Sequence, residues 1–251
     1  MAIKTTSLTG WLKANPTVVS NAIKDDFLKI AKNDMVDLMN KNLTALGDGV
    51  FIGKQQKELG YSYMRMEPWN TTNIGITQAD ADAIVVQYGG YRLGIAIDEV
   101  ERLWGSSTEV EVNSSQDLNS FDGKARTAAI MENAAFSADS PDTYAVAYAY
   151  AYSKTHTGDP GGDSTIAAKS WWLPTMGDLA LIHHYFYTIN LAIARINAAG
   201  KQQATPLGFK DYWSCVESHA INALHQNFSN GYRGSGGRGI RFQVRPVTAW
   251  L

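Results

Sequence analysis

The stretch from Asp211 to Leu251 has two apolar ends and a polar middle. Asp211–Glu217 and Gln243–Leu251 combine aromatic and β-branched residues, which is typical of strands packed on a core. Between them, Ser218–Arg241 consists mainly of Ser, His, Asn, Gly, Tyr and Arg and shows little apolar periodicity. Tyrosine offers contact area at low entropic cost, and Ser, Gly and Asn offer adaptable hydrogen bonds. The pattern predicts a rigid frame that presents a binding surface.

Helical periodicity is clearest in two segments. Apolar residues recur at three- and four-residue steps over Val19–Leu46 and again over Leu179–Gly200. Thr175 precedes the second segment and Asp178 lies three positions further on, a spacing that predicts a capped helix start. From the first segment we predict that residues 1–75 are mainly helical and serve in assembly or docking. Packing of this helix on its own domain is an equal alternative.

Shorter patterns predict the elements between these helices. Two apolar runs, Ala83–Tyr88 and Tyr91–Ile97, flank Gly89-Gly90 and predict a hairpin with a two-residue turn. A predicted helix begins at Thr127–Asn133, and Pro141 ends it. Tyr144–Tyr152 is ambiguous, because its alternation of Ala with Tyr or Val favours a strand whereas its alanine content favours a helix.

Length and composition suit one large domain or a medium-sized domain with an extension. The chain has 251 residues, of which 45% are hydrophobic, and this is enough for a sizeable core. We expect an α+β protein with a ligand-binding domain over residues 76–251 and a boundary near residue 76. The connector Gly49–Ile76 carries too many large apolar residues for a free linker, so it is expected to pack against other parts.

Charge and cysteine content exclude several classes of protein. A net charge of −2 gives no global reason to expect nucleic acid or an anionic membrane as a partner. No segment has the apolar length of a signal peptide or a membrane span, so we expect synthesis in a cytoplasm and no membrane insertion. Cys215, the one cysteine, excludes a disulfide framework and is expected to be a small buried hydrophobe.

No motif supports a catalytic site. The chain lacks H-E-x-x-H and G-x-S-x-G, and no Gly-rich phosphate loop leads into a helix. His219, His225 and Glu217 could form a metal trio, but histidines are ordinary polar groups on a binding surface. We therefore predict a protein that is not an enzyme and that has no metal and no cofactor.

A series of motifs carries a resemblance to a known family. In order, the chain contains LWGS, DGKARTAAI, WWLPTMGDL, YWSCVES, FSNG and VRPV, which span roughly residues 80–251. Together they resemble variable proteins with a C-type lectin fold that diversity-generating retroelements produce, in the form common in gut Bacteroidetes and their phages. Phage major tropism determinants are better-known relatives of this family with the same fold. Two departures are Cys215, where the family usually has a second Ser, and Leu224, where it usually has Trp, so the wall under the display surface is expected to be packed differently.

The resemblance implies a fold and a second signature. The implied fold is a C-type-lectin-like domain, with two helices packed on small antiparallel sheets. In the family the segment that corresponds to Tyr144–Tyr152 is helical, so the resemblance predicts a helix there. Such retroelements mutate template adenines, so a diversified Asn codon never yields Lys, Glu, Gln, Met or Trp. Gln226 is the one member of that set between Ser218 and Phe242, although a Gly- and Ser-rich loop can lack these residues by chance.

The predicted function is the display of a variable surface for binding a receptor, as a phage virion component of tail or fibre that attaches to a host. The expected partners are a host-surface protein or glycan, with no nucleic acid, and further copies or a larger virion assembly through the N-terminal region. The alternatives are a cell-surface adhesin, a purely structural virion protein, and a metal-dependent enzyme of the formylglycine-generating or sulfoxide-synthase type. The contact face is expected to comprise Ser218, His219, Ile221, Asn222, Leu224, His225, Asn227, Ser229, Tyr232, Arg233, Arg238 and Arg241.

Overall fold

The structure, a computed structural model, describes residues 47–58, 61–70, 80–106, 109–113, 117–156, 164–199 and 203–250. The chain divides into two compact units, Met1–Gly47 and Asp48–Leu251, and the fold described below is that of the second. The predicted helix over Val19–Leu46 lies outside the described residues. No described helix is both long and apolar enough to cross a membrane.

The second unit is an α+β fold, as predicted, with helices packed on mainly antiparallel sheets. Its described helices are α3 (Gly123–Glu132), α4 (Ala145–Ala151), α5 (Met176–His184) and α6 (Phe186–Ala198). A six-stranded sheet has the order β2 (Tyr61–Pro68), β1 (Gly49–Glu58), β3 (Ala83–Tyr88), β4 (Tyr91–Ala96), β13 (Val247–Ala249) and β8 (Trp171–Trp172). A five-stranded sheet has the order β11 (Arg233–Gly237), β10 (Asn222–Asn227), β9 (Asp211–His219), β12 (Arg241–Val244) and β5 (Val100–Leu103). A small ribbon joins β6 (Lys154–His156) and β7 (Ser164–Ile166).

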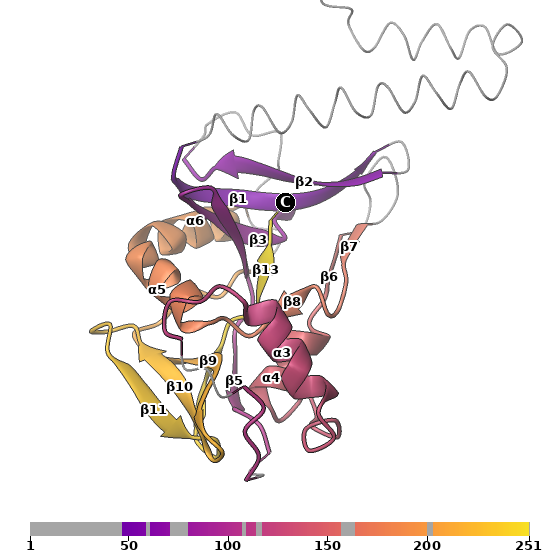
Figure 1. Cartoon of the computed structure of the whole chain (residues 1–251). Coiled ribbons are helices and arrows are strands. Elements are labelled where there is room, and N and C mark those ends of the chain that lie inside the picture. Colours follow the sequence, from indigo (N-terminus) through magenta and orange to yellow (C-terminus); the bar gives the residue numbers. More distant parts are fainter. Residues whose placement is uncertain are drawn as a thin grey trace, which may run out of the picture. The chain divides into compact units, whose positions relative to one another are not determined.

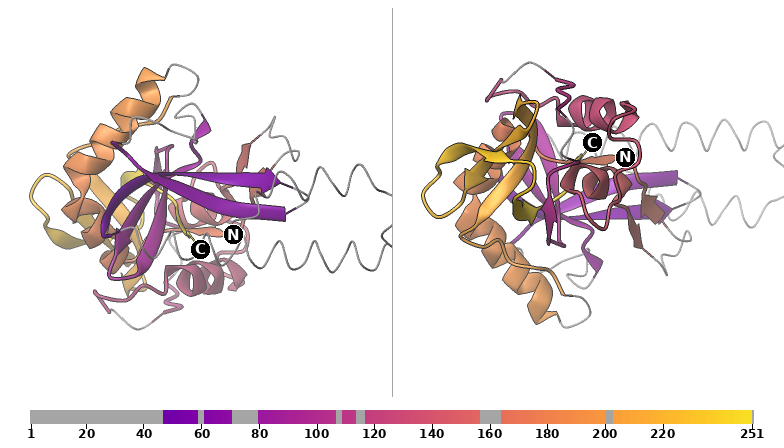
Figure 2. Two further views of the ribbon diagram at one scale, coloured as in Figure 1. Left: turned by 90° about the horizontal axis from the view of Figure 1, so that it is seen from above. Right: turned by 90° about the horizontal axis from the view of Figure 1, so that it is seen from below.

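The helices pack on the two large sheets as two pairs. Helix α6 packs on β1 and β3 of the six-stranded sheet, and α5 packs on β9 and β10 of the five-stranded one. Helices α3 and α4 contact each other and β8. Figure 1 shows the two pairs on opposite sides of β13 and β8, and both views in Figure 2 keep them apart. The β9–β10–β11 strands extend from the rest of the unit and are covered on one side by α5 (Figure 1).

The predicted domain boundary near residue 76 does not match the observed division. Strands β1 and β2 lie in the predicted connector, yet β1 pairs with β3 over Gly49–Gly53, so both strands belong to the six-stranded sheet. The reason is burial, because Val50, Phe51 and Ile52 are each less than 5% exposed. A free linker would leave these three apolar side chains in water. Pairing of β1 in the sheet buries them, which is favourable.

Trp250 explains why small residues occur in the middle of two central strands. The indole is 1% exposed and lies across β1 and β4. A Cβ added at Gly53 would lie 2.5 Å from its Cζ2 atom, and one at Gly94 would lie 2.8 Å from its Cε3 atom. Glycine is required at both positions because the ring occupies the space that a side chain would take.

Most of the short elements predicted from the sequence are confirmed. The hairpin forms as β3 and β4, with Gly89 and Gly90 at φ 55° and 84° in the turn. The helix predicted over Thr127–Asn133 is α3, which starts four residues earlier. The ambiguous Tyr144–Tyr152 segment is helical as α4, because Ala145, Ala147 and Ala149 are buried while part of its tyrosine surface stays accessible.

The helix predicted from Leu179 to Gly200 is two helices. Tyr185 separates α5 from α6 and adopts φ −97° and ψ 14°, outside the helical region. The physical reason is that the two segments serve different sheets, because α5 packs on β9 and β10 whereas α6 packs on β1 and β3. A single straight helix could not follow both sheets.

The predicted cap of α5 is confirmed as a reciprocal capping box. The Thr175 hydroxyl oxygen accepts from the Asp178 backbone N–H at 3.0 Å, and the Asp178 carboxylate accepts from the Thr175 N–H at 2.9 Å. The same hydroxyl donates to the carbonyl of Ser120 at 2.7 Å. One buried side chain therefore both starts the helix and fixes the segment that precedes α3.

We expect Thr175→Ala to lower the free energy of unfolding by about 2 kcal/mol, the upper end for a lost cap, because it leaves a buried donor and acceptor unpaired. Urea denaturation followed by circular dichroism measures this loss. Thr205→Ala, an exposed threonine outside any helix, is the control and should change stability by less than about 0.5 kcal/mol. Equal effects of the two substitutions would contradict the role of the cap.

Candidate ligand-binding surface

The polar stretch Ser218–Arg241 is not a loop, because most of it forms strands. Ser218–Arg241 forms the end of β9 together with β10 and β11, and β11 is the edge of the five-stranded sheet. The glycines of β11 make this pairing fit, because a Cβ at Gly234 would lie 2.7 Å from Nε2 of His225 and one at Gly236 would lie 3.1 Å from Cη2 of Trp213. Sequence patterns missed these strands because the strands contain almost no apolar alternation.

The strands β9, β10 and β11 form one structure, which we call the β9–β10–β11 hairpin. It packs on buried aromatic and aliphatic residues. Phe228 stacks on Tyr212 with ring centroids 4.3 Å apart, and Trp213 packs against Phe242 at 4.5 Å. The residues that support the strands are all at most 2% exposed, four from the two predicted frame segments and Phe228 from the polar stretch: Tyr212, Trp213, Phe228, Val244 and Val247. Cys215 is also fully buried, and burial raises the pKa of its thiol well above the ordinary value, which suits a packing role. The predicted frame beneath the polar stretch therefore exists.

Six of the residues expected on the contact face are exposed: His219, Ile221, Ser229, Tyr232, Arg233 and Arg241. Tyr232 and Ile221 are 63% and 54% exposed, values that are high for large apolar side chains. Three more of the expected residues are partly buried: Asn222, Leu224 and Asn227. Solvent therefore reaches the hairpin mainly at its two ends and along the start of β11.

Arg238 was expected on the contact face and is instead 1% exposed. Its Nη2 atom lies 2.5 Å from Oε1 of Glu217, and its guanidinium carbon lies 4.5 Å from the centre of the Trp104 ring. Arginine can enter the interior here because a carboxylate and an aromatic face compensate for lost hydration. Burial raises the pKa of Glu217 and lowers that of Arg238, so the pair is held together against a desolvation cost.

His225 and Ser218 also lie inside rather than on the face. His225 is 9% exposed, and its Nδ1 atom lies 3.0 Å from Oδ1 of Asp211. Its ring packs against Phe242 at 4.6 Å. Ser218 is 4% exposed and shares a hydrogen bond of 2.5 Å with the hydroxyl of Ser235. Each side chain has a polar partner, Asp211 for His225 and Ser235 for Ser218, which lowers the cost of burying it.

The possible trio of Glu217, His219 and His225 is not brought together as a metal site. The Glu217 carboxylate accepts hydrogen bonds from Arg238 and from the backbone N–H of Asn113 at 2.8 Å. His225 lies opposite Trp213 in the strand register, whereas Glu217 lies opposite Ala223. The described part of the chain contains no group of three or more His, Cys, Asp or Glu residues arranged to hold a metal ion.

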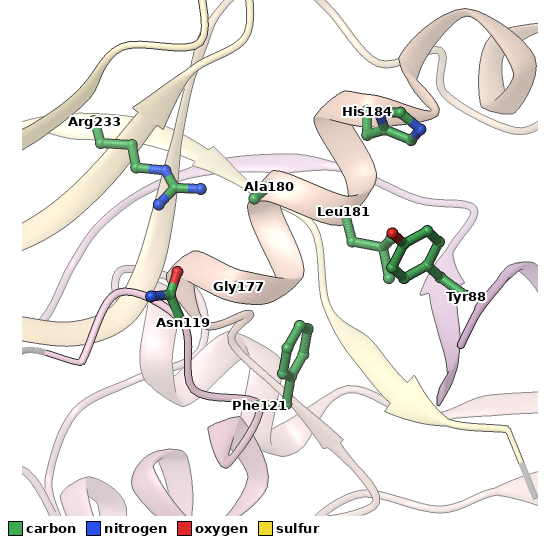
Figure 3. A pocket seen from close by; sticks show the side chains of 8 residues that line it. All are labelled: Tyr88, Asn119, Phe121, Gly177, Ala180, Leu181, His184 and Arg233. Carbon is green, nitrogen blue, oxygen red and sulfur yellow. The ribbon is translucent and has the colours of Figure 1, made fainter. Parts of the chain in front are cut away.

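A groove runs along α5 beside the start of β11, and the sequence did not indicate it. It has a volume of about 250 Å³, and we call it the α5 groove. Figure 3 shows Arg233 and Asn119 toward one end and Tyr88 toward the other, with Phe121 between them. Its lining comes from four separate segments: Tyr88, Asn119, Phe121, Gly177, Ala180, Leu181, His184 and Arg233. Only Arg233 was among the predicted residues, because no local pattern links segments so distant in sequence.

Comparison with known proteins identifies no family. No protein-family model and no curated protein matches the chain. Among solved structures, it is similar to a fimbrial protein from Bacteroides ovatus, with 11% sequence identity and a TM-score of 0.49. The match covers 79% of this chain and 48% of that one, so this chain spans about half the length of its neighbour. This likeness is too distant to support a statement about function.

Proposed function

We propose that this chain is a non-enzymatic ligand-binding protein that uses the exposed ends of the β9–β10–β11 hairpin, on a C-type-lectin-like scaffold, to attach a phage virion to its host. The observation that carries the proposal is the contrast between the exposed and the buried residues of one hairpin. Ile221 and Tyr232 are more than half exposed, while Phe228 and Trp213 in the same three-stranded segment are at most 2% exposed.

This contrast suits a surface whose residues vary. Tyrosine and arginine are among the residues that dominate binding energy at interfaces. Tyr232, Arg233 and Arg241 supply these groups here. Because the frame is buried separately, substitutions at the exposed positions leave the packing of the core unchanged. That independence is what a diversified display surface requires.

The test is a triple variant, Ile221→Ala with Tyr232→Ala and Arg241→Ala. We expect binding of the labelled full-length chain to responsive gut Bacteroidetes cells to fall more than about 100-fold, as for the loss of a central hot spot. The melting temperature should stay within a few degrees of the wild-type value, because exposed substitutions change stability by only about 0.5 kcal/mol each.

The matched control removes the same three kinds of side chain from helices α3 and α6: Tyr187→Ala, Leu191→Ala and Lys124→Ala, all exposed. This control should bind like the wild type. Loss of binding in both triples, or in neither, would contradict attachment through the hairpin. A template repeat beside a reverse transcriptase gene would test the diversification part of the proposal separately.

A further inference from the structure

The α5 groove has an apolar body. Phe121 and Tyr88 are 49% and 55% exposed, although aromatic side chains of this size usually bury most of their surface. Between them, Leu181, Ala180 and Gly177 contribute mostly carbon surface from α5. A solvent-exposed hollow lined by carbon is unfavourable in water, so a ligand with an apolar group gains free energy by filling it.

One end of the groove carries an uncompensated positive charge. The guanidinium of Arg233 forms no ion pair with any carboxylate of the described residues, and no acidic residue lines the groove. This separates Arg233 from Arg238, which is already paired with Glu217. Asn119 lies at the same end and adds an amide donor (Figure 3). The geometry therefore suits a carboxylate, which a guanidinium can bind through two parallel hydrogen bonds.

The walls of the groove are fixed before any ligand arrives. The Thr175 hydroxyl holds the carbonyl of Ser120 at 2.7 Å, and this contact sets the positions of Asn119 and Phe121 on either side of Ser120. The Phe121 ring also packs on Tyr91 at 4.7 Å. Gly177 permits the close approach, because a Cβ there would lie 2.7 Å from the Ser120 carbonyl oxygen. Preformed walls lower the entropic cost of binding.

We propose that the α5 groove receives one large apolar side chain of a protein ligand, with a neighbouring carboxylate of that ligand on Arg233. This deepens the proposed function and rests on it. A volume of about 250 Å³ lies below the ~300–1,000 Å³ of pockets for drug-sized ligands, so it suits one side chain. A sugar ring fits less well, because most of its hydroxyls would face carbon and lose their hydrogen bonds to water.

The test uses a dipeptide probe, acetyl-Asp-Phe-amide, titrated to 20 mM into the full-length chain and followed by saturation-transfer NMR. We expect saturable binding to the wild type. Acetyl-Asn-Phe-amide, which lacks the charge, and acetyl-Asp-Ala-amide, which lacks the ring, should each bind at least about tenfold more weakly. N-acetylneuraminic acid serves as the sugar arm and should show no saturable transfer.

Two variants locate the binding on the protein. Arg233→Ala removes the charge and Ala180→Leu fills the groove with a good helix former, and each should weaken the dipeptide at least about tenfold. Lys210→Ala removes one positive charge from an exposed position outside the groove and should leave dipeptide binding unchanged. Equal weakening by Lys210→Ala would show that general electrostatic attraction is responsible, and this would overturn the proposal.

The outcomes separate this inference from the proposed function. If Ala180→Leu keeps full binding to cells while the hairpin triple loses it, the function stands and the groove is not part of the contact. Absence of saturable dipeptide binding to the wild type, or binding of the sugar in its place, overturns the proposed ligand class. If both Ala180→Leu and the hairpin triple bind cells normally, the proposed function itself fails.

Discussion

Replacing Arg238 with alanine is expected to lower the free energy of unfolding by about 3–5 kcal/mol, because it leaves the buried Glu217 carboxylate without its cation. Both side chains of the pair have relative exposures of 0%. Arg238 also donates to the carbonyl of Val110 at 3.0 Å and lies over Trp104, so packing is lost together with charge. Chemical denaturation monitored by tryptophan fluorescence measures the effect.

Two comparisons make this prediction specific. Arg241→Ala removes an exposed arginine three positions away and should cost less than about 0.5 kcal/mol. Glu217→Gln combined with Arg238→Met should cost less than Arg238→Ala alone, because the double variant has no unpaired buried charge. If Arg238→Ala were as mild as Arg241→Ala, the ion pair would contribute nothing to stability.

The sign of the pH dependence follows from burial. Desolvation raises the pKa of Glu217 in the folded protein above its unfolded value, and loss of the guanidinium raises it further. A carboxyl with a raised folded pKa is protonated preferentially in the native state, so its contribution to stability improves as pH falls through that pKa toward the unfolded value. The deficit of Arg238→Ala should therefore shrink on acidification, as measured by denaturation at a series of pH values.

Replacing Phe228 with alanine is expected to cost about 3–5 kcal/mol, because it opens a cavity under the turn between β10 and β11. The ring is 2% exposed, stacks on Tyr212 at 4.3 Å and meets Phe186 edge-on at 6.1 Å. Neighbouring aromatic rings cannot collapse into the space without leaving their own contacts. Thermal denaturation gives the stability, and amide hydrogen exchange of β10 reports whether the hairpin loosens first.

Phe209 provides the matched control for this variant. It is 61% exposed, although its ring stacks on Phe186 at 4.9 Å. Phe209→Ala should cost about 1 kcal/mol, the value of one aromatic pair with little burial. Equal losses at the two positions would mean that Phe228 does not support the hairpin.

Local patterns in the sequence were sufficient for elements that short-range physics fixes. The Gly89-Gly90 turn forms because glycine accepts positive φ, and the α5 cap forms because Thr175 and Asp178 exchange hydrogen bonds within one helical turn. The burial of Tyr212 and Trp213 was predictable for the same reason, since both lie in one apolar run. Each of these features depends on residues only a few positions apart.

The tertiary structure alone decided which polar side chains of the hairpin face solvent. Arg233 and Arg238 are indistinguishable in the sequence, yet only Arg238 meets a buried carboxylate and the carbonyl of Val110, more than 120 residues earlier. The same holds for the α5 groove, whose lining gathers residues from Tyr88 to Arg233. Burial of a charge depends on partners brought from distant segments, and no local periodicity records them. By itself, the sequence determined the frame of this protein and the polar character of its hairpin; the packing of distant segments decided the surface that the hairpin presents.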